Sequence, residues 1–401
     1  MRWILVIGLF ALAYGDVQEI ESNALALKAK GDAAGALAAF EEAAKLEPKS
    51  ARYQDEIGFL LAVLNRREEA VEHFRRAIEL DPEYAPAEFH LGAAFWLAKD
   101  AVQSIPHLER AVELNPAEAA YQARLGEALE ASGQSEQALP YLQAAVSLRP
   151  GDAASWNLIA LVMQKKGDDM AVVDAYQHAV DANPIDVGAH NNLGMALVNV
   201  RRPEDGMAQF KKALALDPEN NIARMNIGYV HLKKWELDQA VSAFREVIAR
   251  DANLAPAHYN LGVALKDKDD VDAAKAEFSR ALTIDPQLAE AHYMLGIACW
   301  QLGEFEDAAK EMRSAIAIHP DFAGAYFILG TALKQKGDLA AAEEALRTAI
   351  KLDPGNPGPL NTLGQILRLK GDIEGSKRLF AEAARVQKAK ESELGTMLER
   401  K

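Results

Sequence analysis

The chain has 401 residues, half of them hydrophobic and 26% charged, which is the composition of a well-folded soluble protein rather than a disordered or collagen-like one. The formal net charge of −15 argues against a nucleic acid or an anionic membrane surface as the main partner, because either would repel the protein. The single cysteine, Cys299, cannot form an intramolecular disulfide, and no Cys and His cluster has the spacing of a metal site, so we expect neither metal nor cofactor.

The first fifteen residues, MRWILVIGLFALAYG, place one arginine before a short apolar run that ends in small residues. This pattern predicts a secretory signal peptide over residues 1–15, cleaved after Gly15 or, as the alternative, after Ala13. The run is too short to span a bilayer comfortably, and an uncleaved anchor would still export the rest of the chain. We therefore expect an exported bacterial protein, periplasmic or extracellular, with no membrane insertion after signal cleavage.

A period of 34 residues, marked by prolines, runs through the rest of the chain, and only Ala252 breaks the series. Repetition at such a period indicates a solenoid or another repeat architecture. If Val17 is position 1, eleven repeats follow in an array over residues 16–390, and the charged residues 391–401 form a C-terminal cap. The repeats start at residues 17, 51, 85, 119, 153, 187, 221, 255, 289, 323 and 357, and the prolines stand at 48, 82, 116, 150, 184, 218, 286, 320 and 354.

Each repeat has small and bulky residues at fixed positions, which predicts two packed helices. Position 8 is Gly in nine repeats and Ala in two, position 27 is Ala in ten, and position 24 carries a bulky side chain. Small residues opposite large ones pack at high density. The pattern predicts helix A over positions 3 to 14, a turn near position 15, and helix B to about position 30, before the proline. Apolar residues recur at helical rather than alternating spacing, so the fold class is all-α.

These positions resemble the tetratricopeptide repeat (TPR) family, whose pattern has a large residue at 4, Leu-Gly at 7 and 8, aromatics at 11 and 24, Ala at 20 and 27, and Pro at 32. The resemblance spans nearly the whole chain after the signal peptide. It implies a right-handed superhelical solenoid of about eleven 34-residue helix-turn-helix units. In this family helix A lines a concave groove that usually binds peptide segments of other proteins.

The seventh repeat departs most from the pattern. It carries His231 at position 11, Trp235 at the turn, Val247 at 27, Arg250 at 30 and Ala252 in place of proline. We predict a weak interface here, which His231 in a core position would loosen. The alternative is neutral drift, because solenoids tolerate an imperfect repeat when its neighbours are sound.

Histidines recur at position 4 of three repeats, as His190, His258 and His292. Neighbouring helices pack about 8 to 10 Å apart, too far for imidazoles of separate repeats to bind one metal ion at about 2 Å, so we predict that they pack beside the core. Cys299, at position 11, falls in the buried stripe, where a thiol acts as a small hydrophobic group. No nucleophile, metalloprotease or nucleotide-binding motif occurs, and we predict that the protein is not an enzyme.

Positions 2, 6, 9 and 13 of helix A lie opposite its packed side and should be polar if they meet only water. In repeats five to nine position 9 is instead apolar, and position 6 is Asn in three consecutive repeats. A primary amide has a donor and an acceptor, which match a peptide bond, and the row resembles the asparagine ladder of the protein O-GlcNAc transferase superhelix. The alternative is an ordinary solvated helix face. The predicted peptide-binding residues are Asn192, Asn226, Asn260, Leu161, Met195, Tyr229, Val263 and Ile297.

The pattern therefore predicts a non-catalytic protein-protein interaction scaffold that binds extended peptide segments of partner proteins. Position 5 never carries the lysine of the carboxylate clamp found in chaperone-binding TPR domains, so recognition of a C-terminal carboxylate by that clamp is not expected. The alternative is a structural solenoid of the cell envelope that stacks on itself through its ends. The charged C-terminal cap favours a monomer over such stacking.

Overall fold

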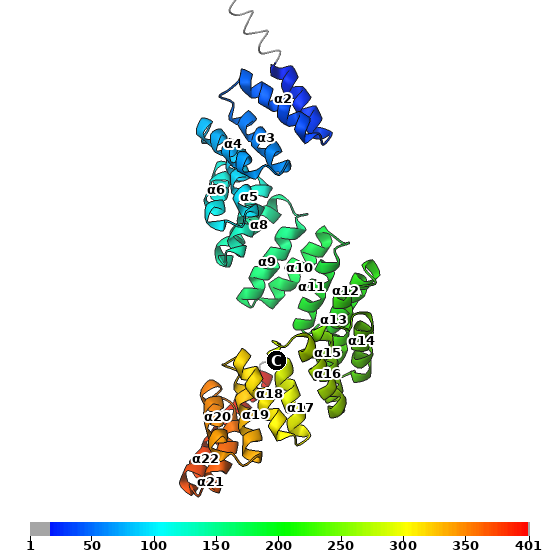
Figure 1. Cartoon of the computed structure of the whole chain (residues 1–401), viewed down its shortest axis with the longest axis vertical. Coiled ribbons are helices and arrows are strands. Elements are labelled where there is room, and N and C mark those ends of the chain that lie inside the picture. Colours follow the sequence, from blue (N-terminus) through cyan, green and yellow to red (C-terminus); the bar gives the residue numbers. More distant parts are fainter. Residues whose placement is uncertain (1–16, 400–401) are drawn as a thin grey trace, which may run out of the picture. The chain divides into compact units, whose positions relative to one another are not determined.

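The computed structural model describes residues 17–399, and every regular element in that range is an α-helix (Figure 1). The described part of the first helix covers residues 17–29. The following helices are α2 (Ala33–Leu46), α3 (Ala51–Val63), α4 (Arg67–Leu80), α5 (Ala85–Leu97), α6 (Ala101–Leu114), α7 (Ala119–Ala131), α8 (Ser135–Leu148), α9 (Ala153–Lys166), α10 (Asp169–Ala182), α11 (Val187–Asn199), α12 (Pro203–Leu216), α13 (Asn221–Lys233), α14 (Leu237–Arg250), α15 (Ala255–Asp267), α16 (Val271–Ile284), α17 (Ala289–Gln301), α18 (Phe305–Ile318), α19 (Ala323–Gln335), α20 (Leu339–Leu352), α21 (Pro357–Leu369) and α22 (Ile373–Glu399).

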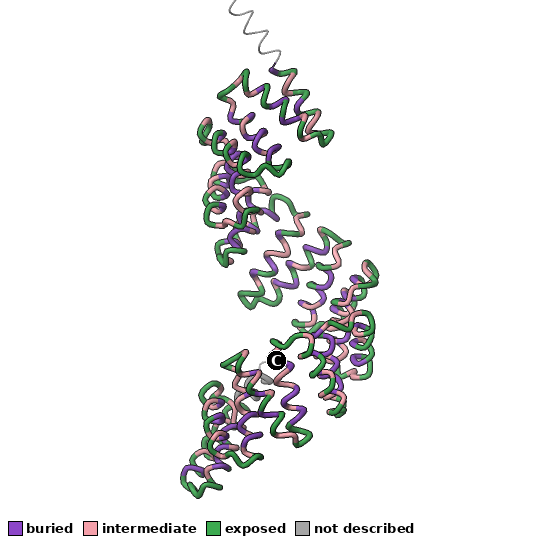
Figure 2. Tube along the Cα trace, viewed as in Figure 1, coloured by how far each residue is buried: buried purple, intermediate pink, exposed green. Residues whose placement is uncertain are grey.

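The chain divides into two compact bodies, an N-terminal body that ends at Gln209 and a C-terminal body that begins at Phe210. Helix A of a repeat contacts the helix B of its own repeat and the helix B of the repeat before it, as α7 does with α8 and α6 in the N-terminal body and α17 does with α18 and α16 in the C-terminal body. Each helix has a buried side and an exposed side, as the alternating colours of Figure 2 show. The all-α class is confirmed, and the helix pairs fit a right-handed solenoid of about eleven helix-turn-helix units.

Helix A begins two residues earlier than the pattern predicted and covers positions 1 to 13 in most repeats, as α3 does from Ala51 to Val63. In several repeats a cap at position 34 of the preceding repeat supports this start. Ser50, Asp186 and Asn220 each accept a hydrogen bond from the backbone N–H three residues on, which satisfies a donor that the helix leaves free. Helix B ends at position 30 as predicted, for example at Leu80.

The turn at position 15 has a left-handed backbone in every repeat for which the structure gives a value. The six glycines there have φ between 74° and 88°. In five other repeats a residue with a side chain takes the same conformation, at φ between 61° and 66°. These residues are Asn65, Lys99, Arg201, Trp235 and Asp269. The turn is therefore a property of the repeat, and glycine only makes it less strained.

The core rests on the contact between position 8 of helix A and position 24 of helix B. A Cβ placed on Gly58 would lie 2.7 Å from the Phe74 ring, and one on Gly262 would lie 2.6 Å from the Phe278 ring. Both rings are buried, at 2% and 0% exposure. The predicted need for a small residue at position 8 is confirmed in these repeats, because any side chain would overlap the ring on the facing helix.

The two terminal segments predicted from the sequence, the signal peptide and the C-terminal cap, lie wholly or partly outside the described residues. The predicted signal peptide, residues 1–15, lies outside the described residues. At the other end α22 continues without a break from Ile373 to Glu399, so the described part of the predicted cap extends helix B of the eleventh repeat rather than forming a separate element. Among residues 17–399 no helix combines the length and the apolarity needed to cross a membrane.

Helix A of the seventh repeat, α13, has few buried side chains. Only Ala223, Gly228 and Val230 are buried in it. Within the described chain the buried Asn221 Oδ1 and Arg224 Nη1 atoms lack a hydrogen-bond partner, which costs free energy in a folded protein. His231 is not the cause that the sequence suggested.

His231 is partly exposed rather than enclosed in the core, and its Nδ1 atom lies 2.6 Å from Glu236 Oε2. Hydrogen bonds from Lys234 and His231 lower the pKa of the Glu236 carboxyl. The histidine is therefore paired across the turn, and the sparse burial and the unpaired atoms of the repeat lie in α13.

We expect residues 221–254 to exchange their amide hydrogens faster than residues 255–288, because α13 has few buried side chains to hold it closed. Hydrogen exchange followed by mass spectrometry on the full chain measures this directly. Replacing His231 with alanine should leave the difference in place. Equal protection of the two repeats would show that the unpaired atoms of α13 do not weaken it.

Candidate peptide-binding surface

We define the helix A face as the side chains at positions 2, 5, 6 and 9 of each helix A. The predicted binding residues all lie on this face, but they fall into two groups because the chain forms two bodies. Leu161, Asn192 and Met195 belong to the N-terminal body, on α9 and α11. Asn226, Tyr229, Asn260, Val263 and Ile297 belong to the C-terminal body, on α13, α15 and α17.

In the N-terminal body the structure brings two of the predicted residues together. Asn192 is exposed and Met195 is half-buried, and both line a hollow of about 210 Å³ between α9, α10 and α11. Gln164 and Asn199 add two more side-chain amides to its walls. Leu161 is 37% exposed but does not line this hollow.

In the C-terminal body part of the apolar row serves the fold itself. Val263 and Ile297 are half-buried and pack against the hydrophobic core of this body, which corrects the interpretation that position 9 has no packing role. Tyr229 is also half-buried, and the Lys233 ammonium lies 5.2 Å from the centre of its ring. The row therefore presents the exposed edges of side chains whose other side is already packed.

The three asparagine amides of position 6 are available. Asn192 is exposed, and Asn226 and Asn260 are half-buried. Within residues 17–399 no side-chain hydrogen bond is assigned to any of the three. The apolar residue of each pair, Met195, Tyr229 or Val263, stands three residues later, close to one helical turn along the same face.

Small residues at position 2 have a structural reason that the sequence did not reveal. A Cβ on Gly324 would lie 3.0 Å from the Tyr293 hydroxyl oxygen, and one on Gly358 would lie 2.8 Å from the Phe327 ring. Each glycine therefore makes room for the aromatic ring at position 5 of the preceding repeat. Gly188, in the N-terminal body, has only the Asp186 carboxylate within this range, at 3.2 Å, so its neighbourhood stays open.

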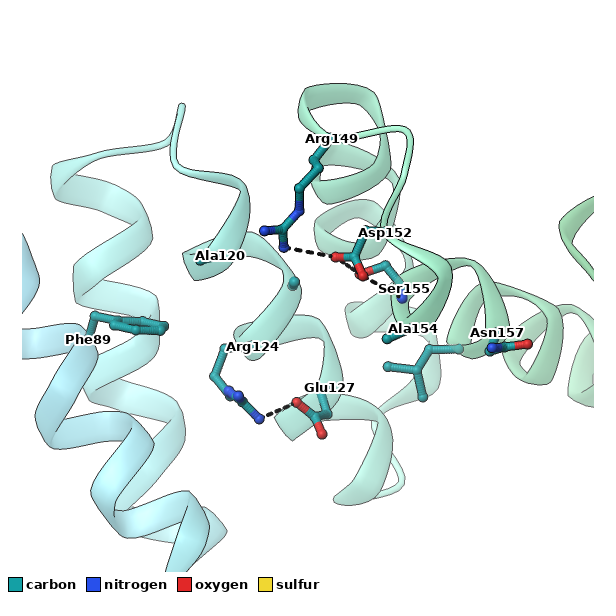
Figure 3. A pocket seen from close by; sticks show the side chains of 11 residues that line it. Phe89, Ala120, Arg124, Glu127, Arg149, Asp152, Ala154, Ser155 and Asn157 are labelled. Atoms are coloured by element: carbon teal, nitrogen blue, oxygen red, sulfur yellow. Dashed lines mark hydrogen bonds and ion pairs between the residues drawn. The ribbon is translucent and has the colours of Figure 1, made fainter. Parts of the chain in front are cut away.

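A larger hollow, of about 500 Å³, lies on the helix A face of repeats three to five in the N-terminal body (Figure 3). We call it the α7 hollow, because α7 lies between α5 and α9, the other two helices that line it. Sequence reasoning missed it, since charged residues at positions 6 and 9 of α7 look like any solvated face. Its lining residues are Phe89, Ala120, Ala123, Arg124, Glu127, Arg149, Asp152, Ala154, Ser155, Asn157 and Leu158.

The histidines of position 4 connect helices rather than form a site. His258 Nδ1 lies 2.6 Å from Glu277 Oε2 on helix B, and its Nε2 lies 3.2 Å from the backbone oxygen of Ala252 in the turn before α15. His292 makes the same two contacts with Glu311 and Pro286, and His190 makes them with Gln209 and Pro184. His190 and His258 are buried, so the packing role predicted for them agrees with their geometry.

Cys299 is 1% exposed and sits in the core of the C-terminal body. Burial is the main cause that raises the pKa of its thiol from 9.0 to about 12, and Lys275 opposes the rise. The thiol therefore stays protonated and inert in the folded chain.

We expect iodoacetamide to label Cys299 very slowly in the native chain. At pH 8 the raised pKa reduces the thiolate fraction on the order of a thousandfold, and burial blocks access as well. In urea the thiol is exposed and its pKa returns to 9.0, so the labelling rate should increase as the pH is raised through 9. Because the protonated thiol is favoured in the folded state, its contribution to stability is present below pH 9 and is lost as the pH rises toward 12. Fast labelling of the native chain at pH 8 would contradict the burial.

Sequence models of the tetratricopeptide repeat match residues 51–84 and 95–162, and four overlapping matches cover residues 191–255, 236–289, 259–323 and 293–357. The chain belongs to the tetratricopeptide repeat family. Its TPR repeats and helix pairs support a protein-interaction scaffold, with other proteins as partners.

Three solved structures are similar to this chain, and the first of them agrees with the TPR fold. A tetratricopeptide repeat protein from Parabacteroides merdae ATCC 43184 is 16% identical, with a TM-score of 0.54 over 62% of this chain and 98% of that chain. Yeast Tom70 is 15% identical, with a TM-score of 0.48 over 96% of each chain. MamA is 26% identical, with a TM-score of 0.40 over 41% of this chain and 97% of MamA. No curated protein matches the sequence.

Proposed function

We propose that this TPR protein is a non-catalytic scaffold that binds extended peptide segments of partner proteins on its helix A face. The observation that carries the proposal is the pairing of a free amide with an apolar side chain. Asn192 with Met195 forms such a pair in the N-terminal body, and Asn226 with Tyr229 and Asn260 with Val263 form two in the C-terminal body. Leu161 and Ile297 add apolar contact beside these pairs in their respective bodies.

Each pair can bind both the backbone and a side chain of an extended peptide. The amide can accept from one peptide N–H and donate to one carbonyl, whatever the sequence of the ligand. The apolar side chain beside it can cover an apolar residue of the ligand. Helices pack about 8 to 10 Å apart, and an extended peptide advances about 3.3 Å per residue. The pairs of neighbouring repeats, such as the seventh and the eighth, would therefore contact about every third residue of the bound peptide.

Replacing Asn192, Asn226 and Asn260 together with alanine removes the amides of both bodies. A peptide on the C-terminal body should then bind about tenfold more weakly, because each of its two lost hydrogen bonds costs about 0.5–1.5 kcal/mol. The ligand is a fluorescent octapeptide selected from a random library on the wild-type protein, and its affinity is measured by anisotropy. The fold should survive, since alanine favours helix.

Gln143→Ala, an exposed amide on the helix B α8, is the matched control and should bind the peptide like the wild type. Tyr229→Ala should also weaken binding, whereas His258→Ala should act mainly on stability. If the triple variant keeps its affinity, the asparagines are a solvated face and the proposal is wrong. A self-assembling solenoid would instead show a molar mass that rises with concentration in light scattering.

We further propose that the scaffold works outside the cytoplasm, in a bacterial envelope. The support is the sequence of residues 1–15, with its single arginine, apolar run and small residues. Protein purified from its native host should have an intact mass that lacks these fifteen residues. A full-length product in the cytoplasm would overturn the export proposal without affecting the peptide-binding one.

A further inference from the structure

The α7 hollow offers a ligand more hydrogen-bond donors than acceptors, because its two arginines keep most of their N–H groups, while its open acceptors are the second oxygen of Glu127 and the buried Asn157 Oδ1. Both oxygens of Asp152 are already used: one accepts from the Ser155 backbone N–H, and the other from the Ser155 hydroxyl and from Arg149, at 3.2 Å. Within the described chain, Arg149 therefore uses one of the five N–H donors of its guanidinium. Its side chain is 55% exposed, so the remaining donors are open to a ligand.

A second guanidinium enters the hollow from another side. Arg124, on α7, donates through one nitrogen to Glu127 Oε2 at 2.5 Å, and both side chains are more than a third exposed. In Figure 3 the Arg149 and Asp152 pair lies on one side of the hollow, and the Arg124 and Glu127 pair lies on the other. The space between them therefore faces two cations whose other N–H groups are unoccupied in the described structure.

The floor between the two arginines is apolar. It is made of three alanine side chains and Leu158. The Phe89 ring forms one wall, and its stacking on Tyr121, with ring centres 4.6 Å apart, holds it in place. A ligand that fills this space therefore needs an apolar group for the floor and a group with acceptor oxygens for the arginines.

We propose that the α7 hollow binds a segment of a partner protein in which an aspartate or glutamate side chain stands next to an apolar side chain. The carboxylate would accept from Arg124 or from Arg149, and the apolar side chain would rest on the alanine floor against Phe89. An internal segment fits better than a chain end, because the lining comes from α5, α7 and α9 and a ligand crossing α7 meets all three. This inference rests on the proposed peptide-binding function and names the chemistry of the partner.

The test is a selection from a library of random octapeptides with acetylated N-termini and amidated C-termini, so that no terminal carboxylate is present. The full chain, Arg124→Met with Arg149→Met, and Arg110→Met are used as separate baits. Arg110 is the matched control, because it pairs with Glu113 on α6 at the same spacing as Arg124 with Glu127 but does not line the hollow.

Peptides from the wild type and from Arg110→Met should include a class with an acidic residue beside a leucine, isoleucine, valine or phenylalanine. The double arginine variant should lose this class and bind its members at least about tenfold more weakly by anisotropy, as expected when charged hydrogen bonds are removed. Changing the acid of such a peptide to its amide should weaken binding to the wild type equally. Circular dichroism confirms that the variants are folded.

Two outcomes would overturn the inference. One is the absence of the acidic class from the wild-type selection, and the other is its recovery on the double arginine variant. The triple asparagine variant separates this inference from the proposed function. If the triple asparagine variant loses peptides while the double arginine variant still recovers the acidic class, the scaffold binds peptides but the α7 hollow is not an acidic-segment site.

Discussion

Replacing Phe278 with alanine should lower the free energy of unfolding of the C-terminal body by about 3–5 kcal/mol, the cost of emptying a buried aromatic site. Phe278 is 0% exposed and lies at position 24 of α16, directly against Gly262 on α15. The glycine has no side chain that could move into the vacated space. The two helices are also held by the buried Ala274 and Ala281, so the site cannot easily collapse.

Urea unfolding followed by circular dichroism measures the loss, and hydrogen exchange locates it. Because a solenoid repeat contacts only its neighbours, protection of amide hydrogens from exchange should fall first in residues 255–284 and in the adjacent repeats. The amide hydrogens of the N-terminal body should keep their protection.

The control is Phe278→Leu, which should cost less than about 1.5 kcal/mol because most of the volume remains. Leucine fills position 24 in three other repeats, as Leu108, Leu142 and Leu346, each at 0% exposure. Equal losses for the leucine and alanine variants would contradict a packing origin of the effect.

The period of 34 residues was enough to predict the fold, because each packed contact repeats. Gly58 and Phe74 have the same relation as Gly262 and Phe278, so one pattern predicts them all. The start of helix A was predicted two residues late, because the capping residues at position 34, such as Ser50, were not used as a signal. The division at Gln209 and Phe210 was not predicted either, since α12 carries the same repeat pattern as its neighbours.

The binding surface was less predictable than the fold. The sequence identified Asn192, Asn226 and Asn260 because they recur at one position. It could not show that Val263 is half packed into the core, since position 9 looks outward on an isolated helix. The α7 hollow could not be predicted from the repeat pattern, because its two arginines occupy different positions of the repeat. Arg149 also enters the hollow from the turn before α9 rather than from a helix face.

The glycine at position 8 leads to the second large effect. Gly262→Val should destabilise the C-terminal body by about 2 kcal/mol, within the range for overpacking a filled core, because its Cβ alone would lie 2.6 Å from the Phe278 ring. Gly262→Ala should also destabilise the body, but by less than valine does. It meets the same ring, but alanine favours helix over glycine by about 1 kcal/mol, and Ala24 and Ala160 occupy this position in repeats one and five.

A double-mutant cycle identifies the ring as the cause of the overlap. In the Phe278→Ala background the methyl groups of the introduced valine would occupy the space that the ring leaves, so Gly262→Val should there be neutral or stabilising. The double variant should then be more stable than the sum of the two single losses by about 2 kcal/mol or more, measured by urea unfolding. If valine costs the same in both backgrounds, the strain comes from the α15 and α16 backbones, and the close approach of the helices rather than the ring sets the requirement for glycine.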